Sequence, residues 1–114
     1  FTISSSGGAN GSDRKLKTNI EDIEYGIETV KLLQPRKFDW KDTPEEEKES
    51  IGFIAQEVQE IIPELVTSSE HPDGEENNTL FLNYAAMTSV LTKAIQEQQA
   101  LIETLTTRIE ALEG

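Results

Sequence analysis

The last thirty residues carry an uninterrupted heptad pattern, which constrains the fold more than any other feature of the chain. Isoleucine occupies the a positions and mainly leucine the d positions, while a glutamine at one d position is expected to fix the register. A single helix has no reason to keep a period of 3.5 residues, so the pattern predicts a coiled coil between copies of the chain. The seam positions step by four and three: Leu91, Ile95, Gln98, Ile102, Leu105, Ile109 and Leu112.

The number of helices in that coiled coil stays open on the pattern alone. Isoleucine at a with leucine at d favours two strands by itself. Arg108 at g and Glu113 at the following e position have the spacing of an interchain ion pair in a parallel coiled coil.

The composition agrees with a core that is shared between chains. Only 35% of the 114 residues are hydrophobic, which is low for an independent globule of this size. The net charge of −12 argues against nucleic acid or an anionic membrane as a partner, because phosphate binding needs clustered lysine and arginine. The sequence contains no run of 18 apolar residues and no signal-peptide pattern, so no membrane partner is expected.

Disulfides, thiolate metal sites and multi-histidine metal sites are excluded within one chain. The sequence has no cysteine and a single histidine, His71, so it lacks the ligands of a thiolate or multi-histidine metal site. The polar segment around His71 lacks the ligand spacing of a calcium loop and is interpreted as a solvated hairpin tip. We expect neither a metal nor another cofactor.

The first 83 residues predict a small head of short strands and helices. We expect a strand over 1–5, a glycine-rich loop over 6–12, and a helix after Asn19 that ends before Pro35. Glu21 and Asp22 should favour its N-terminus, and Ile23, Ile27, Val30 and Leu33 recur at helical spacing. Further along, we expect strands over 36–41, 51–54, 65–67 and 79–83, a helix over 55–62 and a hairpin tip over 68–78.

Two details of that head concern its core. The strand over 36–41 should turn Phe38 and Trp40 inward, and the strand over 51–54 should be buried. The helix over 55–62 should bury Val58, Ile61 and Ile62 on one face and end at Pro63. The fold class is therefore α+β and predominantly helical, with a head over 12–83 and a coiled-coil helix over 84–113.

The strongest candidate for chemistry is the segment S-D-R-K-L-K-T-N-I over residues 12–20. A serine hydroxyl needs an adjacent base to act as a nucleophile, and a neutral lysine can serve as that base. Ser12 and Lys17 could form such a dyad only if the chain folds back, because five extended residues span roughly 17 Å. By spacing alone, a helix N-cap is the more common use of Ser-Asp before basic residues.

Four blocks in order resemble a known family. They are S-D-R-K-L-K-T-N-I, then L-L-Q-P-R-K-F-D-W, then I-G-F-I-A-Q-E-V-Q-E-I-I-P-E-L-V, and L-N-Y-A-A-M before the heptad helix. Together they resemble the C-terminal intramolecular chaperone auto-processing domain of phage endosialidases, tailspikes and tail fibres. The same blocks are similar to the self-cleaving segment of myelin regulatory factor. The resemblance runs from about Ser12 to Glu113 and favours the dyad over the N-cap for Ser12.

The resemblance implies a specific activity. A domain of this kind trimerises and folds an upstream fibre, then releases itself as a self-cleaving serine peptidase that acts once, in cis or within the trimer. The matching positions are Ser12 as nucleophile, Lys17 as general base and Gly11–Ser12 as the scissile bond. Asp13 and Asn19 belong to the matched motif, and the resemblance implies a supporting role for them in positioning the turn. Residues 1–11 would be the end of the fibre, and residues 12–114 the chaperone.

The partners implied are two further copies of the chain and the upstream fibre or tailspike domain. The precursor would be a phage structural protein made in the host cytoplasm, with its chaperone released before or during virion assembly. One alternative is a non-cleaving trimerisation or capping module of a fibrous protein. Another, a cytosolic coiled-coil adaptor, accounts for the helix but leaves the first 80 residues unexplained.

Overall fold

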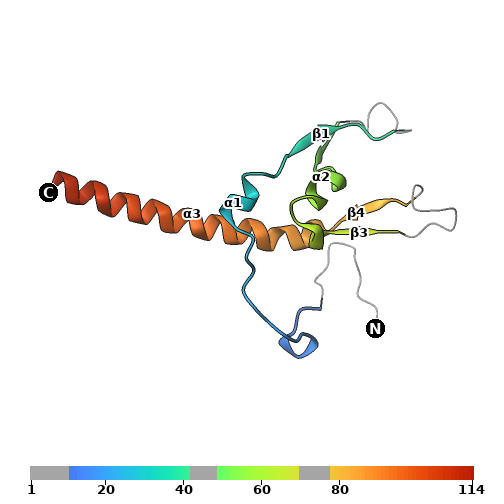
Figure 1. Ribbon diagram of the computed structural model, residues 1–114, viewed down its shortest axis with the longest axis horizontal. Coiled ribbons are helices and arrows are strands. Elements are labelled where there is room, and N and C mark those ends of the chain that lie inside the picture. Colours follow the sequence, from blue (N-terminus) through green and yellow to red (C-terminus); the bar gives the residue numbers. More distant parts are fainter. Residues whose placement is uncertain (1–10, 42–48, 70–77) are drawn as a thin grey trace.

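The computed structural model describes residues 11–41, 49–69 and 78–114, and its longest element is a C-terminal helix (Figure 1). This helix, α3, runs over Tyr84–Glu113 and carries a small head at its N-terminal half. The radius of gyration is 19.3 Å, whereas a compact domain of this length would have about 13 Å. The elongation comes from α3, whose last residues, 101–114, are all exposed. Residues 1–5 and most of the expected hairpin tip, with His71, lie outside the described residues.

The head is a mixed arrangement of short elements, which confirms the α+β class. Two antiparallel pairs form its strands: β1 (Arg36–Phe38) with β2 (Ser50–Gly52), and β3 (Val66–Ser68) with β4 (Leu80–Leu82). The second pair confirms the strands expected on either side of the hairpin tip. The remaining elements are the 3-10 turns η1 (Arg14–Leu16) and η3 (Pro63–Leu65) and the helices α1 (Ile27–Val30) and α2 (Ala55–Gln59).

The core lies between α2, η3 and the first turns of α3. Val58 and Ile62 are each 1% exposed, so the inner face expected for the helix over 55–62 is confirmed, although α2 itself ends at Gln59. Fully burying side chains of this size stabilises the fold by about 1.5–3 kcal/mol each. The other buried side chains of this cluster are Leu33, Leu65, Met87 and Val90.

Helix α3 presents two different faces. Asn83 caps its N-terminus by accepting a hydrogen bond from the amide of Ala86 at 2.9 Å. Met87, Val90 and Ala94 are buried against the head. The heptad seam points elsewhere, since at 100° per residue its centre lies about 60° around the helix from this buried face. Ile95, Ile102 and Leu105 on the seam are half exposed or more in the single chain.

The helix expected between Asn19 and Pro35 is much shorter in the structure. Only Ile27–Val30 is α-helical, and residues 20–26 have no regular structure, so Glu21 and Asp22 do not flank its N-terminus. The apolar spacing of Ile23 with Ile27 therefore predicted a helix that does not form there. The first turn begins instead where a side chain from α3 satisfies the amide of Ile27.

The prediction that Trp40 and Ile51 are buried is also wrong in the single chain. Trp40 is 59% exposed and Ile51 is 84% exposed, whereas both were expected to be buried. Among the described residues strand β2 pairs only with β1, and Ile51 lies opposite Lys37 in this two-stranded sheet. Trp40 lies just beyond β1, where its ring packs edge-on against Phe38 with centroids 5.2 Å apart.

Candidate functional site

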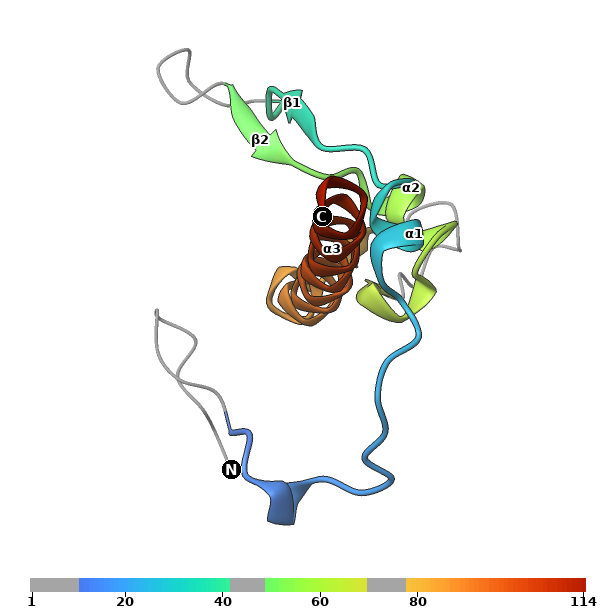
Figure 2. The same cartoon turned by 90° about the vertical axis from the view of Figure 1, so that its left-hand side faces the viewer.

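The segment that precedes α1 forms an arm, defined here as residues 11–24, which extends away from the head (Figure 2). All residues of the arm are exposed in the single chain. Within the described part of the chain, its hydrogen bonds all lie among residues 12–17. The arm is therefore shaped by a local turn rather than by packing against the head.

That turn is the 3-10 turn η1. Asp13 is its N-cap, because its carboxylate accepts a hydrogen bond from the amide of Lys15 at 3.0 Å. The backbone closes the turn through the amide of Lys17, which donates to the carbonyl of Arg14 at 3.0 Å. The cap role that the sequence allowed for Ser12 thus falls to Asp13, and the Ser12 hydroxyl remains available for another contact.

The turn brings Ser12 and Lys17 together. The ammonium Nζ of Lys17 donates to the Oγ of Ser12 at 2.6 Å, a short hydrogen bond. An extended chain would separate these residues by roughly 17 Å, so the fold-back required for a dyad is present. Asn19 follows with a φ of 52°, a left-handed conformation that asparagine tolerates better than most residues. It redirects the chain after the turn.

The chemistry open to this pair depends on the protonation of the lysine. A charged ammonium can only donate, whereas a neutral amine can take the proton of a serine hydroxyl and activate it as a nucleophile. Ser12 and Lys17 are both exposed in the single chain, and water stabilises the charged form of a lysine. A covering surface would favour the neutral form that a general base needs.

The arm joins the head at two contacts that sequence reasoning missed. The hydroxyl of Tyr25 donates to both carboxylate oxygens of Glu64, at 2.7 and 2.9 Å. This hydrogen bond is the main reason that the pKa of Tyr25 lies above its ordinary value, with smaller contributions from burial and from the charges of Glu64 and Glu24. No spacing rule links residues 39 apart, so only the fold could reveal this pair.

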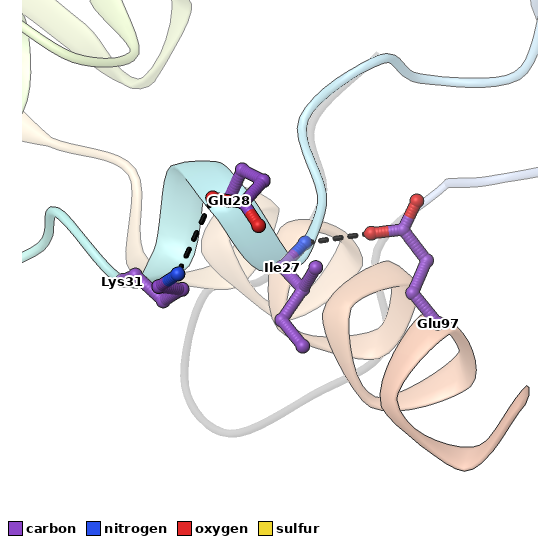
Figure 3. Close-up of polar contacts among 4 residues, drawn as sticks. All are labelled: Ile27, Glu28, Lys31 and Glu97. Atoms are coloured by element: carbon purple, nitrogen blue, oxygen red, sulfur yellow. Dashed lines mark hydrogen bonds and ion pairs between the residues drawn. The ribbon is translucent and has the colours of Figure 1, made fainter. Parts of the chain in front are cut away.

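The second contact fixes the start of α1 on α3. Glu97 accepts a hydrogen bond from the amide of Ile27 at 2.7 Å (Figure 3). Gly26 makes room for this approach, because a Cβ at that position would collide with the Glu97 carboxylate. Glu97 is one residue from Gln98 of the seam. The attachment of the arm and the coiled-coil seam are therefore carried by adjacent residues of one helix.

Neither metal chemistry nor a membrane span is indicated by the described residues. In ranges 11–41, 49–69 and 78–114, no group of three or more His, Cys, Asp or Glu side chains is placed to hold a metal ion. Over the same ranges, no helix is long and apolar enough to cross a bilayer.

Comparison with known proteins identifies the class to which this fold and arm belong. Residues 12–67, about half of the chain, match the family described as chaperone of endosialidase, a family that carries a peptidase name. The chain belongs to this chaperone family, which confirms the relationship indicated by the four sequence blocks. The match begins at Ser12 and ends within β3.

Two curated relatives extend the match beyond that range. They are the Long tail fiber protein Gp37 of Enterobacteria phage M1 and the protein of the same name from Enterobacteria phage Ox2. Each is 33% identical over 100 residues, an alignment that covers 84% of this chain and 39% of the relative. The chain therefore spans about two fifths of the length of these relatives.

Proposed function

We propose that this chain is the C-terminal chaperone of a phage tail fibre, and that it releases itself from the fibre by cutting the Gly11–Ser12 bond. Residues 12–114 would be the chaperone, and residues 1–11 the end of the upstream fibre. The family match supports a chaperone role, and the similarity to long tail fibre proteins supports a fibre as its client. The match to the family begins at Ser12, which is where the released chaperone would begin.

The observation that carries the cleavage proposal is the 2.6 Å contact between Lys17 Nζ and Ser12 Oγ. A serine hydroxyl and a lysine amine within hydrogen-bond distance form the minimal nucleophile–base pair of a serine–lysine peptidase. Asp13 and Asn19 support the pair indirectly, because one caps the turn and the other redirects the chain behind it.

The reaction proceeds in two steps. Neutral Lys17 takes the proton from Ser12 Oγ, and the oxygen attacks the carbonyl carbon of Gly11. The bond between that carbon and the Ser12 nitrogen breaks as the nitrogen takes the proton back from Lys17, which leaves an ester between Gly11 and Ser12 Oγ. Water then hydrolyses the ester to a Gly11 carboxylate and the Ser12 hydroxyl, so the chaperone begins with a free Ser12 amine.

Assembly into a homotrimer would activate this step. The exposed heptad seam supplies the surface through which three copies of α3 associate as a parallel coiled coil. Association of the helices raises the effective concentration of the attached fibre strands and sets their register. Packing between the copies also removes water from the arm, which favours the neutral amine of Lys17. Cleavage would then follow only after assembly and would make it kinetically irreversible.

The same similarity to tail fibre proteins supports a place for the chain in a virus particle's assembly. The precursor is a phage structural protein made in the cytoplasm of the host. Its chaperone leaves before or during virion assembly, and the strongly acidic surface of the chaperone, with a net charge of −12, suits a transient contact.

The test is the mass and N-terminal sequence of the protein recovered from cells that express the full chain behind its fibre. We expect a product that begins at Ser12 and a trimer by sedimentation. Ser12→Ala and Lys17→Ala should each leave the chain intact. Lys17→Arg is the matched control for charge, since arginine keeps the positive charge but cannot become a neutral base; it should also stay intact.

Two results would change this assignment. Cleavage of Ser12→Ala at the parental rate would exclude Ser12 as the nucleophile. A parental chain that forms stable trimers with an attached fibre and is never cut would leave the non-cleaving capping module as the function.

A further inference from the structure

An open groove with aromatic walls lies between the two strand pairs and the start of α3. Its volume is about 720 Å³, and its lining includes five of the seven aromatic residues of the chain. Trp40, Phe81 and Tyr84 are 59%, 55% and 49% exposed, so the described residues of the single chain leave the groove unfilled. The other two aromatic residues of the lining are Phe38 and Phe53.

The arm has an apolar surface that is equally uncovered. Leu16 is 59% exposed, Ile20 is 54% exposed and Ile23 is 37% exposed. Leu16 directly precedes Lys17 of the dyad in the sequence, and Ile20 and Ile23 follow it within six residues. Exposed apolar residues concentrated on one segment mark an interaction surface.

The arm does not reach the groove of its own chain. It extends to one side of α3, whereas β1, which contributes Phe38 to the groove, lies on the opposite side in both views (Figures 1 and 2). The partner of each surface must therefore come from elsewhere.

Two observations indicate that another copy of this chain supplies that partner. The groove is continuous with the heptad seam, because Tyr84 lines the groove and occupies the d position one heptad before Leu91. The turn at the start of the arm also differs in charge from the rest of the chain. Its residues 12–17 carry Arg14, Lys15 and Lys17 against Asp13, a net charge of +2, while the chain as a whole has a net charge of −12. Because residues 21–24 add three carboxylates, only this turn, and not the whole arm, is attracted to the acidic surface of a neighbouring copy.

We propose that the arm of one copy docks into the aromatic groove of a neighbouring copy, with Leu16, Ile20 and Ile23 against Trp40, Phe81 and Tyr84. This inference rests on the proposed function and adds to it the surface that completes the cleavage site. The docked arm is bent and desolvated by a neighbour rather than by its own head. Each dyad is thus assembled from one chain and covered by the next, which explains why a single chain leaves Ser12 and Lys17 in water.

Mixed trimers test this arrangement directly. One chain keeps Ser12 and Lys17 but carries Trp40→Ala and Phe81→Ala, which damage the groove through exposed side chains and leave the buried core unchanged. The second chain keeps the groove but carries Ser12→Ala. Neither chain should be cut within the time that the parent needs when expressed alone, because we expect the loss of apolar contact to slow cleavage of the groove variant by about tenfold or more.

Co-expression then separates the two possible geometries. If the arm docks on a neighbour, chains with the damaged groove are cut once they share trimers with the second chain. If the arm folds into the groove of its own chain, no mixture is cut, and the proposal is wrong. Parental cleavage of the groove variant alone would also overturn it, while leaving the Ser12–Lys17 assignment intact.

A second measurement does not depend on cleavage. Trp40 is the only tryptophan, so its fluorescence reports on the groove. In the Ser12→Ala background, we expect a shift of its emission to shorter wavelength as the protein assembles, and loss of that shift in Ile20→Asn trimers. Glu21→Gln, a change in the same arm that removes no apolar side chain, is the control and should keep the shift. An emission spectrum that Ile20→Asn leaves unchanged in intact trimers would overturn the docking.

Discussion

The carboxylate of Glu97 accepts a hydrogen bond from the backbone amide of Ile27 at 2.7 Å, and this contact joins residues 70 positions apart. It satisfies one of the amides that the first turn of a helix leaves without an intrahelical partner. It also places a negative charge at the positive end of α1. A long helix thereby caps a very short one, and the arm that carries the dyad starts from this point.

We expect Glu97→Ala to lower the free energy of unfolding by about 1–2 kcal/mol, because a partly buried amide loses its acceptor. Glu97→Gln is the matched control, since the amide oxygen of glutamine can still accept the hydrogen bond. It should lower the free energy of unfolding by less than Glu97→Ala does. Urea unfolding at a fixed protein concentration measures both. Equal losses for the two variants would show that the charge alone, and not the hydrogen bond, matters at this site.

Gly26→Ala should act through the same contact. The added Cβ would collide with the carboxylate of Glu97, whose flexible side chain must then move and give up its bond to Ile27. The expected loss is again about 1 kcal/mol. In a double-mutant cycle, Gly26→Ala should cost much less in the Glu97→Ala background, because the bond is already absent. Additive losses would mean that Gly26 is needed for a different reason.

The longest and most local features could be predicted from the sequence. The heptad spacing of α3 depends only on neighbouring turns of one helix, and the helix runs over Tyr84–Glu113 as expected. Helix α2 was predictable for the same reason, because Val58 and Ile62 are four residues apart and so lie on the same face of a helix, where both are buried. The proximity of Ser12 and Lys17 is local too, although the sequence alone could not show that Asp13 would take the capping role.

The predictions that failed concern features that depend on contacts between distant segments. The apolar spacing of Ile23 and Ile27 resembles a helix, but the helix begins only where Glu97 provides a cap. Trp40 and Ile51 were assigned to a core that one chain does not provide. For Trp40, the expectation of burial agrees with the groove docking proposed above.

The bond between Tyr25 and Glu64 predicts a loss of stability in strongly alkaline solution. The pKa of Tyr25 lies above its ordinary value of 10.0, mainly because its hydroxyl donates to Glu64. A group with a raised folded-state pKa contributes its full stability below the unfolded pKa and loses it as the pH rises through the folded value. Tyr25→Phe should therefore be less stable than the parent below pH 10, and the difference should shrink above it. A constant difference up to the alkaline limit of folding would contradict this.

The ion pair between Arg36 and Glu57 predicts the opposite dependence in acid. The two side chains are joined by two hydrogen bonds, at 2.7 and 3.0 Å, and the pKa of Glu57 lies below its ordinary value chiefly because of the bond to Arg36. The ion pair therefore contributes to the stability of the fold above about pH 4.5. This contribution is lost as the pH falls through the lower pKa that Glu57 has in the folded state. Thermal unfolding of Glu57→Gln between pH 3 and 7 should show less pH dependence than the parent.

Two controls accompany the Glu57 variant. Glu21→Gln removes one negative charge from the arm and should leave the acid dependence unchanged. Because the pair is exposed at the surface, 1 M salt should also reduce the difference between Glu57→Gln and the parent. An acid dependence that Glu57→Gln leaves intact would assign it to other carboxylates.

The exposed seam of α3 predicts that one charged residue there abolishes self-association. Ile102→Asp would bring three carboxylates together at the centre of the proposed trimer, at an a position where charge is costly to bury. Thr107→Asp introduces the same charge at the outer f position of the same heptad and is the matched control. We expect sedimentation to show a fall in association of more than about 100-fold for Ile102→Asp and little change for Thr107→Asp.

The fold of the head should survive this change, because α3 packs on it through a different face. Met87, Val90 and Ala94 hold the head, and Ile102 is 50% exposed in the single chain. Amide exchange should therefore still show protection around Val58 and Ile62 in the dissociated Ile102→Asp chain, while the end of α3 loses protection. Unfolding of the head on dissociation would mean that its stability comes from the trimer and not from its own core. An Ile102→Asp chain that still associates like the parent would exclude the seam as the interface.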